Sequence, residues 1–158
     1  MKRRKGFSLI ELLIVIAIIL IIASIAIPSI LGALRSAHEA AAAKAVQTIN
    51  SAEITYHSSY PTVGYAAVLA ALGGTSCAPP SATSACLIDS QIASGTKSGY
   101  RFVISGVTGT PAATYQVIAS PEVPNQTGVR YFCSFSDGVV RASLSPIATC
   151  DSSVPPLQ

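Results

Sequence analysis

Glu11 is the residue of this chain best placed to do chemistry, because it is a carboxylate inside an apolar segment. From Leu12 to Leu34 the next 23 residues carry no charge. An ionised acid inside a membrane helix costs on the order of 3 kcal/mol, so it marks a function and needs a partner. The next cation is Arg35, about 36 Å further along a straight helix. The partner of Glu11 must therefore come from elsewhere.

A new chain end would supply that partner. If the chain is cut after Gly6, the amine of Phe7 lies beside the apolar segment. Its pKa of about 8 leaves it mostly protonated at neutral pH. The amine could pair with Glu11 of its own chain, or with Glu11 of a neighbour displaced along an assembly axis. Glycine at position 6 suits cleavage there, because it has no side chain to obstruct a peptidase.

The element that must position these residues is a membrane helix. The uncharged run is long enough to cross a hydrocarbon core of about 30 Å at 1.5 Å per residue. Lys2, Arg3, Arg4 and Lys5 precede it, which predicts a cytoplasmic N-terminal end and a single crossing. A plain membrane anchor, or a secretory signal cut at Ser24-Ile25-Ala26, are the alternatives. The length of the run and the position of Glu11 argue against both.

The segment Lys5-Gly6-Phe7-Ser8-Leu9-Ile10-Glu11-Leu12-Leu13 resembles the class III signal of type IV pilins and type II secretion pseudopilins. The resemblance implies that a prepilin peptidase cuts between Gly6 and Phe7 on the cytoplasmic side and then methylates the amine of Phe7. It also implies that Glu11 aligns incoming subunits by attracting the Phe7 amine of an adjacent one.

The function implied is structural. The expected protein is the major subunit of an extracellular type IV pilus, a helical homo-oligomeric filament polymerised through the N-terminal helix. Before assembly it would be held in the bacterial inner membrane, and an assembly platform with ATPase machinery would build the filament. Motility, adhesion and DNA uptake all remain open. A type II secretion pseudopilin, or a minor tip pilin acting as an adhesin, are the alternatives.

One long helix is expected over residues 7–59, with its membrane-spanning part at about 9–34. Pro28 lies inside it and predicts either a kink or a locally loosened turn. Residues 34–57 are amphipathic, with one apolar face made by Leu34, Ala37, Ala41, Ala45, Ile49, Ala52 and Tyr56. Arg35, Glu39, Lys44, Gln47, Asn50 and Glu53 are placed mostly away from that face. Pro61 predicts the end of the helix before Tyr60.

The fold class expected is α+β, a pilin-like long helix packed against a roughly four-stranded antiparallel sheet. The domains are a leader at 1–6, the helix at 7–59 and a head at 60–158. The head comprises a connecting region at 60–98, with a short helix at 65–72, and a sheet with C-terminal segment at 99–158. The predicted strands are 100–105, 114–120, 129–136 and 139–144. Asp137-Gly138 predicts a two-residue hairpin turn between the last two strands.

The four cysteines are Cys77, Cys86, Cys133 and Cys150, and they allow three disulfide pairings. We favour the sequence-adjacent pairing, Cys77–Cys86 and Cys133–Cys150. No CxxC pair occurs, and His38 and His57 lie far upstream, so a zinc site is not expected. By resemblance, a Cys133–Cys150 bridge would match the disulfide-closed C-terminal loop of many type IV pilins.

Other function classes find little support in the composition. Without the basic leader, six Lys/Arg face seven Asp/Glu, which leaves no extended basic face for direct nucleic-acid binding. Asp89, Glu122, Asp137 and Asp151 are scattered and expected to be solvated, with Asp137 a turn residue. No GxSxG, P-loop or HExxH motif occurs. We therefore expect no enzyme activity, no catalytic residue, no cofactor and no metal.

Overall fold

The computed structural model describes residues 7–74 and 77–157. The expected leader at 1–6, with Gly6, lies outside the described residues. The chain forms two compact units, Met1–Leu34 and Arg35–Gln158. Each unit is described by itself below.

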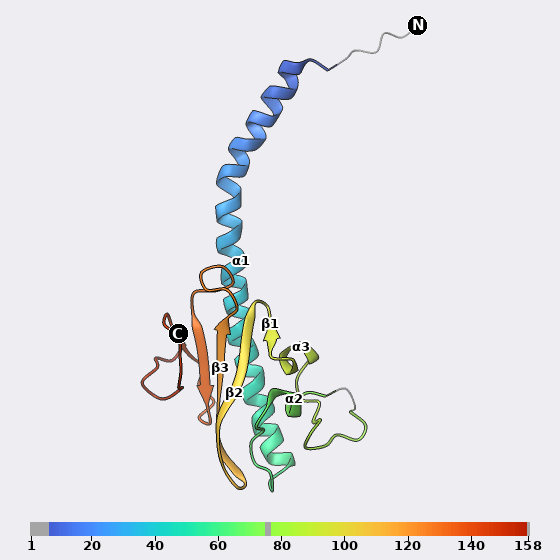
Figure 1. Ribbon diagram of the computed structural model, residues 1–158, viewed down its shortest axis with the longest axis vertical. Coiled ribbons are helices and arrows are strands. Elements are labelled where there is room, and N and C mark those ends of the chain that lie inside the picture. The colour runs from blue at the N-terminus through green and yellow to red at the C-terminus, as the bar shows by residue number, and fades with distance from the viewer. Residues whose placement is uncertain (1–6, 75–76, 158) are drawn as a thin grey trace. The chain divides into compact units, whose positions relative to one another are not determined.

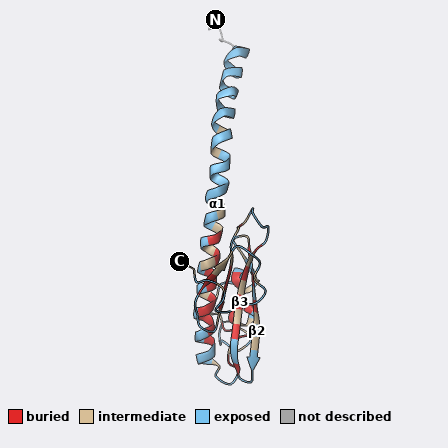
Figure 2. Cartoon of the chain, turned by 90° about the vertical axis from the view of Figure 1, so that its left-hand side faces the viewer, coloured by how far each residue is buried: buried red, intermediate tan, exposed pale blue. Residues whose placement is uncertain are grey.

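The helix α1, Leu9–Ser59, contributes to both units and has 51 residues. It ends before Tyr60-Pro61, as the proline predicts. Pro28 lies inside it, and the helix is assigned on both sides of the proline. A kink or a loosened turn at Pro28 stays a prediction. Nearly all side chains of α1 in the first unit are exposed, whereas the later turns have a buried face (Figure 2).

The second unit holds a five-stranded antiparallel sheet in the order β1-β2-β3-β4-β5 (Figure 1). The strands are β1 Thr96–Lys97, β2 Tyr100–Gly109, β3 Ala112–Pro121, β4 Tyr131–Phe135 and β5 Arg141–Ser143. Each strand pairs with the next along the chain. The fold is therefore the expected α+β arrangement of a long helix packed on an antiparallel sheet, with one strand more than expected.

The core lies between the later turns of α1 and one face of the sheet. It contains Ala42, Ala45, Val46, Ile49, Ala52 and Tyr56 from the helix, with Tyr100, Phe102, Val117, Ala119 and Phe132 from the strands. The predicted apolar face is confirmed from Ala45 to Tyr56. Ala41 is half-buried, and Ala37 is exposed. The small alanines let the helix backbone approach the sheet closely, so the large aromatic side chains come mainly from the strands.

The strand missed by sequence reasoning is β1. It has only two residues, too few for an alternating pattern to be visible. A two-residue turn at Ser98-Gly99 connects it to β2, with φ angles of 51° and 72°. Positive φ at both central residues is the geometry of a type I′ hairpin. Ser-Gly at this point was the available signal.

The prediction of a two-residue hairpin turn at Asp137-Gly138 is wrong, because the observed connection is longer. The last paired residues of β4 and β5 are Cys133 and Arg141, so the connection is longer than two residues. Gly138 N donates to the Phe135 carbonyl, and Val139 N donates to Asp137 Oδ1. Because the Gly138 and Val139 amides form hydrogen bonds within the turn, they are not available to pair β4 with β5.

The short helix expected at 65–72 is also shorter than predicted. The observed α2 is Leu69–Leu72, and a second short helix, α3, follows at Ser90–Ala93. The amides of Tyr65 and Ala66 are taken by other acceptors, the Ala112 carbonyl and a carboxylate of α1. Asp89 caps α3 through two backbone amides and pairs with Lys97, so it is not merely solvated.

Candidate functional site

The first turn of α1 holds Glu11 by a hydrogen bond. Ser8 N donates to Glu11 Oε2 at 2.8 Å. Ser8 precedes the first helical residue and Glu11 is three residues later, which is the spacing of a capping box. The Ser-x-x-Glu pattern carried that signal, and our reading of the sequence missed it. Glu11 thus has a local role at the helix start as well as the charge that needs a partner.

Among the described residues, no side-chain cation forms an ion pair with Glu11. The three ion pairs found in residues 7–74 and 77–157 are Lys97–Asp89, Arg130–Glu39 and Arg141–Asp137, all in the second unit. Phe7 lies two residues before the helix start and is 83% exposed. The predicted cleavage at Gly6 would therefore place a new amine one helical turn from the Glu11 carboxylate.

The helix turns that follow Glu11 expose apolar side chains. Leucine, isoleucine and valine side chains from Leu9 to Leu31 are exposed, most of them by more than half. Their exposure is spread around the helix. By length and composition this part of α1 could cross a membrane, and the most apolar stretch has no buried residue. A helix that is apolar on all sides is stable only in lipid or packed among other helices.

The head is joined to the helix by polar contacts as well as by the core. Glu39 accepts from Val129 N at 2.8 Å and from Arg130 Nε at 2.7 Å. Burial alone would raise the pKa of Glu39, but these hydrogen bonds and the Arg130 charge outweigh it and hold the pKa below its usual range. Glu39 was expected away from the packed face and is instead buried. It ties the β3–β4 connection to α1.

Asn50 makes a second polar link, in the middle of the interface. Its Nδ2 donates to Ser134 Oγ at 2.9 Å and to the Gly138 carbonyl at 3.1 Å, and its Oδ1 accepts from the Tyr115 hydroxyl. A buried amide costs free energy unless its groups are paired. Only one helix–sheet register pairs all of these groups, so Asn50 helps to fix that register.

Glu53 is the third buried polar residue of α1 and is fully buried. Its Oε2 accepts from Ala66 N at 2.8 Å, and no partner is found for its Oε1 among the described residues. Burial raises the pKa of this carboxyl to about 7, which the single backbone hydrogen bond does not offset. Asn50 and Glu53 had been placed off the packed face with Glu39. The apolar pattern alone could not show that the sheet offers them partners.

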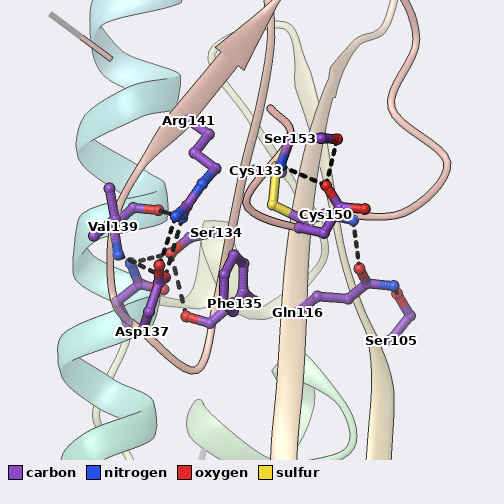
Figure 3. The surroundings of a disulfide bond; sticks show 12 residues. Ser105, Gln116, Cys133, Ser134, Phe135, Asp137, Val139, Arg141, Cys150 and Ser153 are labelled. Atoms are coloured by element: carbon purple, nitrogen blue, oxygen red, sulfur yellow. Dashed lines mark hydrogen bonds and ion pairs between the residues drawn. A yellow bond between two sulfur atoms is a disulfide. The ribbon is translucent and has the colours of Figure 1, made fainter. Parts of the chain in front are cut away.

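Both disulfides join sequence-adjacent cysteines, Cys77–Cys86 and Cys133–Cys150. The second attaches the C-terminal segment to β4 (Figure 3). Cys150 N also donates to Gln116 Oε1 at 2.7 Å, and Gln116 Nε2 donates to Ser105 Oγ. Further along, Leu157 N donates to the Val140 carbonyl. The tail is thus held against the sheet by a covalent bond and by backbone contacts.

Asp137 and Arg141 shape the loop that the second disulfide encloses. The Arg141 guanidinium donates to Asp137 Oδ2 at 2.6 Å and lies over the Phe135 ring (Figure 3). Hydrogen bonding by Arg141 and Val139 holds the pKa of Asp137 below its usual range, although partial burial acts the other way. Asp137 is an exposed turn residue, as expected, and it also forms an ion pair with Arg141.

We expect removal of the Cys133–Cys150 bridge, by replacing both cysteines with alanine, to lower the free energy of unfolding by roughly 3 kcal/mol. The cross-link closes a sequence separation of 17 residues, and both cysteines are buried. Urea unfolding of the full chain in detergent, followed by near-ultraviolet circular dichroism, measures the change. The matched control replaces Cys77 and Cys86, which close a separation of nine residues at a more exposed place. A larger loss in that control would contradict the assigned role.

In the described part of the chain, no three side chains of His, Cys, Asp or Glu gather as a metal-binding group. His57 packs against the Tyr65 ring. The residues with unusual chemistry are therefore Glu11, at the start of an exposed apolar helix, and the buried polar residues that attach the head.

Comparison with known proteins points to the same end of the chain. Residues 1–27 match the family model described as the prokaryotic N-terminal methylation motif. The matched region contains Gly6, Phe7, Glu11 and the first two-thirds of the uncharged run. No curated protein and no solved structure matches the chain.

Proposed function

Because the chain carries the class III signal of the type IV pilin and pseudopilin superfamily, we propose that it is the major subunit of an extracellular type IV pilus. The observation that carries the proposal is Glu11, an acid that pairs with no side-chain cation in the described part of the chain. It lies at the start of a helix whose first turns are exposed and apolar on all sides. Such a helix is stable in a membrane, and among parallel copies of itself in a filament.

The proposed sequence of events begins in the inner membrane. The precursor lies there with its basic leader in the cytoplasm, and prepilin peptidase cuts between Gly6 and Phe7 and methylates the Phe7 amine. Assembly then brings the charged amine of one subunit near Glu11 of another, so that each satisfies the other inside an apolar surround. The apolar surface of α1 moves from lipid to neighbouring helices, with the assembly platform and its ATPase supplying the work.

The head favours a pilus subunit over a type II secretion pseudopilin. The Cys133–Cys150 bridge encloses the C-terminal surface and, among the described residues, no acidic cluster for calcium is found there. A minor pilin at the filament tip, binding a ligand through its head, is a further candidate. Sheared surface filaments made mostly of this chain would identify the major subunit.

Two measurements test the proposal together. Electron microscopy of purified surface filaments, with the chain traced in the density, should show this sequence with α1 at the filament centre. Mass spectrometry of the same material should give a chain that begins with N-methylated Phe7. Surface material beginning after Ala26 would instead indicate an ordinary secretory signal.

We expect Gly6→Leu to leave nearly all of the protein as uncut precursor in the membrane, with no filaments. The added side chain obstructs approach of the peptidase to the backbone at the cleavage point. Immunoblotting of membrane fractions separates precursor from mature chain by mass. A matched control is Gly32→Leu, because a Cβ at Gly32 meets no atom within 4 Å. That control should be cut normally, and normal cutting of Gly6→Leu would contradict the cleavage site.

A further inference from the structure

The two asparagines of the chain, Asn50 and Asn125, have opposite surroundings. Asn50 is buried, and both ends of its carboxamide are hydrogen-bonded to the sheet and its connections. Asn125 is exposed, and no hydrogen bond of its side chain is found within residues 7–74 and 77–157. The carboxamide of Asn125 can therefore be modified without the loss of a hydrogen bond that holds the head.

Asn125 lies in a turn of the β3–β4 connection, residues 122–130. Its backbone amide donates to the Gly128 carbonyl at 2.9 Å, and the amides of Gln126 and Thr127 both donate to the Val123 carbonyl. The φ of Asn125 is 66°, in the left-handed region that asparagine adopts more readily than most residues. The turn is therefore closed by backbone bonds, and the exposed Asn125 side chain is not needed to close it.

The sequence Asn125-Gln126-Thr127 has the acceptor pattern for N-linked glycosylation, which is Asn-X-Ser/Thr with X other than proline. Asn50 is followed by Ser51-Ala52 and lacks the pattern. This modification is made on surface loops of segments that lie outside the cytoplasm. Residues 122–126 are all exposed, so the loop meets the first condition. The proposed single membrane crossing meets the second.

A structural role explains part of this pattern. Asparagine suits the positive φ, and Thr127 Oγ1 is hydrogen-bonded to both backbone groups of Val123 at 3.2 Å. Glycine at position 125 would meet the first need equally well, because it adopts positive φ without strain. The turn makes no use of the Asn125 carboxamide, and that carboxamide is the group to which a sugar is attached.

We propose that Asn125 is an N-glycosylation site, modified with an oligosaccharide from a lipid pyrophosphate carrier. This rests on the proposed function, because it requires the second unit to lie outside the cytoplasm. In the transfer, a bond forms between Asn125 Nδ2 and C1 of the first sugar, while the bond between that C1 and the pyrophosphate oxygen breaks. Nδ2 gives up one proton, which leaves with the lipid pyrophosphate. No oxidant or reductant is needed.

The sugar changes the surface of the head at one place. Val123, two residues before Asn125, is 45% exposed, and Pro124 between them is exposed as well. A bulky, hydrated sugar covers this apolar surface and makes the head more soluble. It also keeps the β3–β4 connection out of contacts between heads, so that subunits pack through other surfaces.

The site is tested on the full chain taken from the cells that naturally make it, both from their membranes and from sheared surface material. Trypsin releases residues 102–130 as one peptide, because Arg101 and Arg130 flank it and no Lys or Arg lies between them. Mass spectrometry should find this peptide heavier by whole sugar residues, and electron-transfer fragmentation should place the added mass on Asn125. An unmodified peptide in both samples, or a sugar on a serine or threonine instead, would overturn the proposal.

Three variants separate the acceptor pattern from the turn. Asn125→Gly keeps the positive φ and removes the acceptor, so the added mass should be lost completely while the turn is preserved. Thr127→Ala should lose it as well, whereas Thr127→Ser keeps a hydroxyl at this position and should retain it. Both disulfides, read from the same material without reduction, show that each variant has folded. Added mass that persists in Asn125→Gly would contradict the assignment.

The side of the membrane on which the head lies is checked separately, by adding protease to spheroplasts. A head that is protected from the protease lies in the cytoplasm and contradicts the proposed function itself. A head that is digested, from a chain whose peptide 102–130 is unmodified, contradicts the glycosylation site alone.

Discussion

Glu11→Gln is expected to leave cleavage between Gly6 and Phe7 intact and to reduce surface filaments by roughly 10-fold to 100-fold. Gln keeps an oxygen that can accept from Ser8 N, so the cap of α1 is preserved. What it loses is the negative charge. A hydrogen bond to a charged group contributes about 1.5–3 kcal/mol, and each 1.4 kcal/mol is about a tenfold change in an equilibrium.

The comparison with Glu11→Val separates the two roles of this residue. Val removes both the charge and the cap, so both variants should lose filaments if attraction of the Phe7 amine is the main role. Filament yield is measured from sheared cells, and cleavage and methylation by mass spectrometry. Glu122→Gln, which neutralises an exposed acid of the head, is the control and should assemble normally. Normal filaments in Glu11→Gln, with loss in Glu11→Val, would reduce Glu11 to a helix cap.

The second large effect concerns Glu53 and pH. The pKa of this carboxyl is raised from 4.5 to about 7 by burial. The folded protein therefore keeps a proton between those values that the unfolded chain has lost. The free energy of unfolding should fall as pH rises through this window, by on the order of 3 kcal/mol from this group. Tyr56 and Tyr115 nearby stay neutral there, because their pKa values are raised above 10.

Glu53→Gln isolates this effect. Its amide oxygen can accept from Ala66 N as the carboxyl does, and it does not titrate. At pH 8 the variant should be more stable than the unaltered chain, and its stability should be nearly flat between pH 4.5 and 7. Urea unfolding of the full chain in detergent at several pH values gives the measurement. The pKa of Glu39 is lowered, so its contribution to the free energy of unfolding is lost only at a more acidic pH. The pH dependence due to Glu53 can therefore be measured separately from that due to Glu39. A variant with the same pH slope as the unaltered chain would refute the role of Glu53.

The three buried polar residues of α1 explain why an alanine-rich helix can hold a head domain in one position. Ala42, Ala45 and Ala52 allow close approach but give little shape to the interface. Glu39, Asn50 and Glu53 each meet a specific group on a different segment: Arg130, Ser134 and Ala66. A slip of the helix along the sheet would leave all three without partners, at a cost the apolar contacts alone would not impose.

The head shows where sequence reasoning reached its limit. The strand segments were found because each is a run of β-branched or aromatic residues, and Gly, Pro and Asn separate the runs. The ends of the strands and the turns between them were not predicted correctly. Ser98-Gly99 forms the two-residue turn between β1 and β2, whereas the β4–β5 connection that contains Asp137-Gly138 is longer. The choice depends on Arg141, which binds Asp137 and the Val139 carbonyl and so draws the turn residues out of the ladder.

By itself the sequence determined the N-terminal methylation motif, the uncharged run and the acid at the start of that run, because these depend on residue type and spacing alone. These features can be recognised from the local sequence, because they do not depend on contacts with residues far along the chain. Only the tertiary structure decided that Glu39, Asn50 and Glu53 face inward and that burial raises the pKa of Glu53 to about 7. Whether a polar side chain is buried depends on partners supplied by segments far along the chain, and periodicity along one helix carries no information about them.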